Sequence, residues 1–161
     1  MDAVRRLLTL LDQNQVFYRH STHPIAYTAL EVATAEHLPG HMVAKTVVFV
    51  SEKGYAMAVL PADMWVNLDE LRQAVGAQRL ELATEREIGE LFGDTCELGA
   101  MAPFGNGTLY ELPIYVDSSL AVEDLIAVNA GTHRDVVQLR YSDFARLVKP
   151  AVIHFARSAA A

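Results

Sequence analysis

One lysine at the start of an apolar segment is the first residue placed where it could do chemistry. Lys45 precedes the run Thr46-Val47-Val48-Phe49-Val50, which is rich in β-branched and aromatic side chains and predicts a buried strand. An ammonium beside a core strand is costly unless something negative meets it. Two interpretations stay open on this pattern alone. Either the ammonium sits in water at the open end of the strand, or the strand fixes it to meet a substrate.

A loop rich in small residues is the second candidate, at Gly99-Ala100-Met101-Ala102-Pro103-Phe104-Gly105. Gly99 permits a positive φ, Pro103 fixes its own φ, and the alanines leave the backbone uncovered. Such a segment can present several N–H groups to a carbonyl or an oxyanion. The same residues are also compatible with an ordinary surface loop.

A second turn of small residues, Asn129 to His133, lies between two predicted strands. As a functional site, Gly131 would let a ligand approach the backbone, and Thr132 or His133 would offer polar contacts. The alternative is a plain β-turn. Asp117 ends another strand, where it either caps the following turn through Ser118 and Ser119 or faces a pocket and meets an amino group.

Other catalytic chemistries lack their sequence patterns. The histidines form no metal-binding motif, and neither a nucleophile elbow nor a phosphate-binding loop is present, so we expect no metal and no cofactor. Cys96 has no obvious base or helix N-terminus beside it to lower its pKa, which favours a packing role.

Composition limits the class of protein. The chain has 161 residues, of which 52% are hydrophobic, and a net charge of −7. Such values predict one globular domain over residues 1–161, with its core at about 2–150, and argue against a broad basic surface that coats nucleic acid. A local pocket that binds one nucleic-acid end remains compatible. No run is long enough to span a membrane and the start does not resemble an export signal, so we expect a cytoplasmic protein.

The elements that would position these residues follow from hydrophobic periodicity, caps and turn residues. Helices are expected at 2–14, 28–37, 67–75, 84–92 and from Ser142 to before Pro150; strands are expected at 16–20, 45–50, 55–60, 79–82, 109–116, 125–128 and 136–139. Strands mixed with short helices and tight turns predict an α/β domain with a mixed sheet. The tail from Ser158 to Ala161 carries no packing signal.

Several of these features, taken in order, resemble the YbaK/prolyl-tRNA-synthetase editing-domain superfamily. They are the His23-Pro24 region that ends at Thr28, the lysine of Ala44-Lys45-Thr46-Val47, the helix that starts at Asn67, the Gly-x-x-x-Pro loop, the strand that ends in Asp117, and the late turn at Gly131. The resemblance covers about residues 2–150, and it rests on the order and spacing of the motifs.

The resemblance implies an α/β (α+β-like) domain with a curved, mostly antiparallel sheet flanked by short helices. It implies hydrolysis of the ester in mischarged aminoacyl-tRNA, with Lys45 as the lysine essential for deacylation and the Gly99–Pro103 loop along the aminoacyl site. Expected substrate contacts also include Asp117, Thr28 and the turn from Gly131 to His133. The expected partners are mischarged tRNA and an aminoacyl-tRNA synthetase. The alternative is a non-catalytic module that binds an aminoacyl-nucleotide or a tRNA end.

Overall fold

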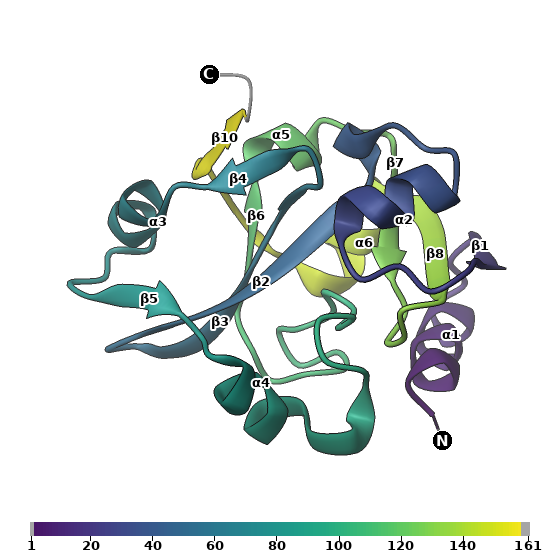
Figure 1. The fold of residues 1–161 in the computed structure, drawn as a ribbon, viewed down its shortest axis with the longest axis horizontal. Helices are drawn as coiled ribbons and strands as arrows, with labels where there is room; N and C mark the ends of the chain where they lie inside the picture. Colours follow the sequence, from purple (N-terminus) through teal and green to yellow (C-terminus); the bar gives the residue numbers. More distant parts are fainter. Residues whose placement is uncertain (1, 159–161) are drawn as a thin grey trace.

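A computed structural model describes residues 2–158 of the chain. Short helices surround a set of mostly antiparallel strands (Figure 1). The helices are α1 (Ala3–Gln13), α2 (Ala29–Ala35), α3 (Leu68–Val75), α4 (Glu85–Phe92), α5 (Ser118–Ala121) and α6 (Tyr141–Val148), with 3-10 turns η1 (Gly40–Met42) and η2 (Gly93–Thr95). The strands are β1 (Tyr18–Thr22), β2 (Ala44–Ser51), β3 (Gly54–Pro61), β4 (Met64–Val66), β5 (Leu80–Leu82), β6 (Ile114–Asp117), β7 (Leu125–Asn129), β8 (Asp135–Arg140), β9 (Ala151–Ile153) and β10 (Ala156–Ser158).

The strands form three hydrogen-bonded groups. Five strands run in the order β5-β2-β3-β6-β9, three in the order β1-β8-β7, and β4 pairs with β10. The β3–β6 and β6–β9 pairs are parallel and the other pairs are antiparallel. A bridge between Val43 and Ala127 joins the first two groups. The predicted class, a mixed α/β fold with mostly antiparallel strands and flanking helices, is confirmed.

The buried side chains form three clusters, and two of them lie on opposite faces of β2. The largest contains Ala44 and Val48 of β2 together with the loop residues Met101 and Ala102. A second lies under α2, and a third joins Phe49 to α3 and the β4 region. Because successive strand residues point to opposite faces, Lys45 shares its face with Phe49 and not with Ala44.

Most predicted helices and strands are present, with local signals that match. Thr84 and Glu87 form the predicted capping box of α4, and Gly76 ends α3 with a left-handed φ of 73°. Each conformation follows from local chemistry, because a threonine oxygen binds an otherwise unpaired N–H and glycine tolerates a positive φ.

Three predictions at element boundaries were wrong. The first strand begins at Tyr18 because Val16 still bonds back to Leu11 at the end of α1. Most of the predicted strand from Leu109 to Val116 is a turn, and only Ile114–Asp117 pairs as a strand. The last helix begins at Tyr141 without a cap from Ser142, since the Tyr141 N–H is bound by the Asp124 carbonyl at 2.9 Å.

The end of the chain is more ordered than the sequence predicted. The strands β9 and β10 lie beyond the predicted core limit of residue 150, and Ser158 pairs with Met64. The rest of the predicted loose tail, residues 159–161, lies outside the described residues.

Candidate active site

The Lys45 side chain is held against β4. Its Nζ donates a hydrogen bond to the Met64 carbonyl and lies 4.7 Å from the centre of the Trp65 ring. Burial lowers the pKa of the Lys45 ammonium, and the nearby Asp63 carboxylate partly offsets this effect. The turn after β3 and the start of β4 therefore surround one half-buried ammonium with a carbonyl, an aromatic face and a carboxylate. The ammonium keeps two further N–H donors for another partner.

The Gly99–Pro103 loop is buried after its first residue. Ala100 is 0% exposed and Met101 and Ala102 are each 2% exposed, while Gly99 adopts the left-handed φ of 87° that its identity permits. Within residues 2–158, the N–H groups of Gly99, Met101 and Ala102 have no hydrogen-bond acceptor. Unpaired N–H groups in buried backbone are rare in folded proteins. This loop can therefore supply donors to a carbonyl or an oxyanion.

The turn after β7 is hydrogen-bonded to this loop. The Gly131 N–H donates to the Ala100 carbonyl at 2.9 Å, and the Gly131 carbonyl accepts from the Glu97 N–H at 2.8 Å. The Glu97 carboxylate also accepts from the His133 N–H at 2.7 Å. Two predicted parts of the site, which lie about thirty residues apart in the chain, are thus held together by five groups of the backbone and one side chain.

The His133 ring faces the start of the loop and the segment before α2. Its centre lies 4.9 Å from the centre of the Tyr27 ring, and its Cε1 is 3.8 Å from where a Cβ on Gly99 would stand. His133 is therefore a titratable side chain that lies beside Gly99, at the start of the loop.

Gly131 and Thr132 serve the turn itself. A Cβ on Gly131 would come within 2.4 Å of the Ala3 Cβ, and its φ is 100°, so the neighbour that approaches this glycine is α1. The Thr132 hydroxyl donates to Asp135 at 2.6 Å and accepts from the N–H groups of Arg134 and Asp135. The polar contacts expected from Thr132 are thus used within the turn.

Asp117 is fully buried and binds backbone groups. One carboxylate oxygen accepts from the N–H groups of Phe155 at 2.7 Å and Ala156 at 2.8 Å, and the other accepts from the N–H and hydroxyl of Ser119. Burial by itself would raise the pKa of the Asp117 carboxyl, but these hydrogen bonds outweigh it and hold the pKa below its usual range. Of the two roles predicted for Asp117, the structure shows the capping one, extended to the C-terminal segment.

Thr28 caps α2 through a hydrogen bond from the Glu31 N–H at 3.1 Å. Tyr27, which precedes this helix, touches the His133 ring. Leu30, in its first turn, and Asp63 both lie within 3.5 Å of the position of a Cβ on Gly40. No hydrogen bond or ion pair joins Lys45 to the Gly99–Pro103 loop within the described part of the chain. The residues around the start of α2 therefore lie near His133 on one side and near Gly40 and Asp63 on the other.

Comparison with known proteins decides which family has this arrangement. A model of the aminoacyl-tRNA editing domain matches residues 23–147. The chain belongs to the aminoacyl-tRNA editing domain family. It is 31% identical over 160 residues to the multifunctional Ser/Thr-tRNA deacylase ProXp-y of Escherichia coli K12. This alignment covers 96% of the present chain and 93% of ProXp-y. It is 26% identical to the prolyl-tRNA editing protein ProX of Acetoanaerobium sticklandii over 92% of each.

A solved structure shares the fold over the whole length. It is described as a candidate trans-editing enzyme for prolyl tRNA synthetase, and it superposes with a TM-score of 0.82 at 24% identity, covering 98% of this chain and 99% of the other. The resemblance stated from the sequence motifs is thus confirmed at the level of family and fold.

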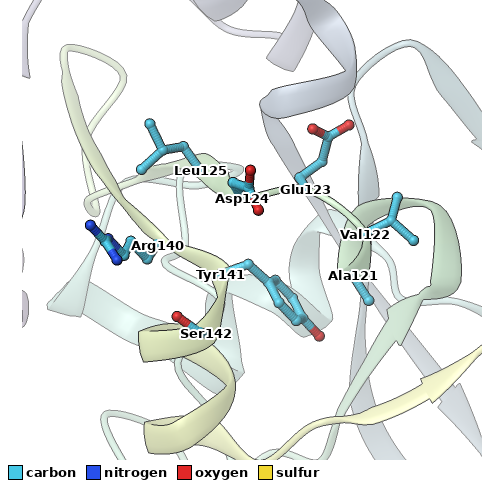
Figure 2. Close-up of a pocket in the computed structure, with 8 residues that line it drawn as sticks. All are labelled: Ala121, Val122, Glu123, Asp124, Leu125, Arg140, Tyr141 and Ser142. Atoms are coloured by element: carbon cyan, nitrogen blue, oxygen red, sulfur yellow. The ribbon is translucent and has the colours of Figure 1, made fainter.

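A cavity of this editing domain lies away from the predicted site. Its volume is about 690 Å³, and it opens between the α5–β7 connection and the start of α6 (Figure 2). Glu123, Asp124 and Arg140 are the charged residues among those that line it. None of the predicted site residues borders this cavity.

Metal and thiol chemistry find no support in the described residues. Residues 2–158 contain no cluster of three or more histidine, cysteine or acidic side chains that could hold a metal ion. Burial raises the pKa of the Cys96 thiol, which therefore stays protonated near neutral pH and agrees with the packing role expected for it. No helix within the same residues is long and apolar enough to cross a membrane.

Sequence reasoning missed the neighbours that complete the site. Lys45 is contacted by Trp65, His133 by Tyr27, and the Gly131 turn by Glu97. Each of these neighbours follows a turn or a loop without periodicity. For Trp65 the only signal in the sequence was a single tryptophan two residues after Asp63, and it points to no particular chemistry.

Proposed function

We propose that this editing domain acts in trans and hydrolyses the ester that joins an amino acid to the terminal ribose of a mischarged tRNA. The observation that carries the proposal is the Gly99–Pro103 loop, which has unpaired N–H groups and begins beside His133 at Gly99. The similarity to a named tRNA deacylase over nearly the whole chain supports the same reaction.

The loop N–H groups bind the ester carbonyl. When water attacks the carbonyl carbon, the oxygen gains negative charge and the fixed N–H groups stabilise it. A preorganised donor of this kind lowers the barrier by about 3 kcal/mol. The bond from the carbonyl carbon to the ribose oxygen then breaks, the ribose oxygen takes a proton, and a free amino acid and an uncharged tRNA leave. A hydroxyl of the terminal ribose helps to activate the water.

Lys45 positions the terminal nucleotide as a fixed positive charge. Its ammonium is immobilised on the Met64 carbonyl and retains donors for a phosphate or ribose oxygen. Since Lys45 and the loop pack on different faces of β2, a nucleotide that reaches both passes over the start of α2, beside Tyr27 and His133. His133 and Thr28 lie along this route.

The amino acid that is removed depends on the volume of the pocket. A difference of one methylene between small side chains is worth only about 1–3 kcal/mol, so specificity is a matter of degree. The tRNA is delivered directly or by an aminoacyl-tRNA synthetase that acts as a partner.

A panel of mischarged tRNAs tests the proposal directly. We expect turnover of at least one of them by the wild-type chain and a large loss in Lys45→Ala. Lys53→Ala is the matched control, because Lys53 is an exposed lysine whose ammonium binds the Val75 carbonyl far from the loop. Full activity of Lys45→Ala would refute the role of Lys45. Binding of charged tRNA without turnover of any substrate would instead favour the alternative of a non-catalytic module.

A further inference from the structure

Trp65 stands at the candidate site with most of its ring uncovered. It is the single tryptophan of the chain, it is 61% exposed, and it lies in the three-residue strand β4. We propose that Trp65 is the stacking platform for a base of the single-stranded aminoacyl end, a role that rests on the proposed function. The kind of ligand follows from the neighbouring charge. An aromatic face beside an ammonium matches a nucleotide, in which a base lies beside its phosphate.

The backbone and the ring of Trp65 each have a partner. The backbone pairs with Arg157 of β10, and the Lys45 Nζ lies 4.7 Å from the ring centre. An ammonium at this distance is attracted to the ring face and fixes its orientation. A single exposed apolar side chain is common on protein surfaces. Trp65 differs from other exposed apolar residues because its ring is in contact with Lys45, the residue proposed to bind the substrate through its charge.

The charge of the whole chain gives stacking a larger share of the affinity. With a net charge of −7 the protein lacks the excess of cations that drives binding to a long phosphate backbone. Stacking on an aromatic side chain does not depend on net charge, and it operates on any base of an unpaired strand. A single-stranded end bound by one ring and one ammonium is therefore compatible with an acidic protein.

Intrinsic fluorescence reports on this contact, since no other tryptophan contributes to the signal. The probe is the single-stranded trinucleotide CCA, titrated into the wild-type chain, with the same trinucleotide lacking its terminal base as the control. We expect saturable quenching with CCA that weakens when the terminal base is absent. Equal responses to the two oligonucleotides, or no response to CCA, would overturn the assignment.

Steady-state deacylation gives the second readout. In Trp65→Ala we expect KM for the mischarged tRNA to rise about 5- to 160-fold with kcat unchanged, which is the range that one stacked base supplies. Trp65→Phe should recover most of the loss, because phenylalanine also stacks. Phe17→Ala is the matched control, since Phe17 is 89% exposed in the connection between α1 and β1, at the opposite side of the molecule from β4 (Figure 1).

The outcomes separate this inference from the proposed function. Turnover that is lost in Lys45→Ala but unchanged in Trp65→Ala would leave the deacylase in place and refute the platform. A fall of kcat at constant KM in Trp65→Ala would also refute it, because the ring would then act only by positioning Lys45. Quenching by CCA without turnover of any mischarged tRNA would refute the deacylase and support the platform.

Discussion

Replacement of Asp117 by asparagine should destabilise the fold in a pH-dependent way. The two oxygens of this buried carboxylate accept hydrogen bonds from Phe155, Ala156 and Ser119. Asparagine has one acceptor oxygen, so either the pair at Phe155 and Ala156 or the pair at Ser119 would face an NH₂ group. A hydrogen bond to a charged acceptor contributes about 1.5–3 kcal/mol, a neutral one about 0.5–1.5 kcal/mol, and an unpaired buried N–H costs about 1–3 kcal/mol.

Because water can reach Ser119, which is only half-buried, we expect the amide to keep its oxygen on the buried Phe155 and Ala156 N–H groups. The weakening of these two bonds and the poorer contact with Ser119 together give an expected loss of about 2–4 kcal/mol at neutral pH.

The sign of the pH dependence follows from the lowered pKa. The Asp117 carboxyl of the folded chain has a pKa below its usual range, whereas the unfolded carboxyl titrates near about 3.9. The stabilisation is therefore complete above the unfolded pKa and is lost as the pH falls through the folded pKa. The difference between wild type and Asp117→Asn should shrink in the same interval.

Urea denaturation from pH 7 down to pH 3 measures this difference. Asp94→Asn serves as the control, because Asp94 is exposed in η2 and the same charge is removed without a buried partner. A loss of less than about 0.5 kcal/mol at pH 7, which is the range of an ordinary surface substitution, would refute the reasoning. So would a loss that stays constant on acidification.

Three further outcomes follow from the structure. Thr84→Ala should cost about 1 kcal/mol in the free energy of unfolding, because it removes the oxygen that binds the Glu87 N–H, and thermal denaturation checks this value. Gly105→Ala should cost more than Thr84→Ala in the same assay, since its Cβ would stand 2.2 Å from the Leu112 carbonyl oxygen; equal costs would contradict the clash. In deacylation assays corrected for spontaneous hydrolysis, KM for the mischarged tRNA should rise as the pH approaches, from below, the pKa of an ordinary lysine. Burial lowers the pKa of Lys45, so its charge is lost at a lower pH than that of an exposed lysine. A KM that stays constant across that interval would argue against a charged role for Lys45.

Local signals in the sequence were sufficient for much of the secondary structure. The capping box at Thr84, the glycine that ends α3 and the hairpin of β2 and β3 each depend on residues that are close in the chain. The strands β4, β9 and β10 were not predicted because each has three residues and pairs with a distant segment. The equally short β5 was predicted because Arg79 extends its alternation of polar and apolar residues, a pattern that the other three strands lack.

The sequence indicated candidate site residues but not how they are arranged. Motif order brought out Lys45 and the Gly99–Pro103 loop; the family that these motifs indicated is confirmed, and the roles of the residues stay predictions. The hydrogen bonds that join the loop to Gly131 involve only backbone groups, which leave no trace in side-chain types. The partners of Lys45 come from a turn that was predicted only as the end of a strand, so neither Met64 nor Trp65 could be placed beside it.

The pairing of β4 with β10 has a consequence for how the protein is made on the ribosome. Met64, whose carbonyl holds the Lys45 ammonium, is paired with Ser158, and Asp117 anchors the residues that lead into β10. The lysine and the loop are synthesised long before β10, but the support of β4 requires the last described strand to leave the exit tunnel. A nascent chain therefore carries all the predicted site residues before β10 is available to pair with β4, the strand whose Met64 carbonyl accepts from Lys45.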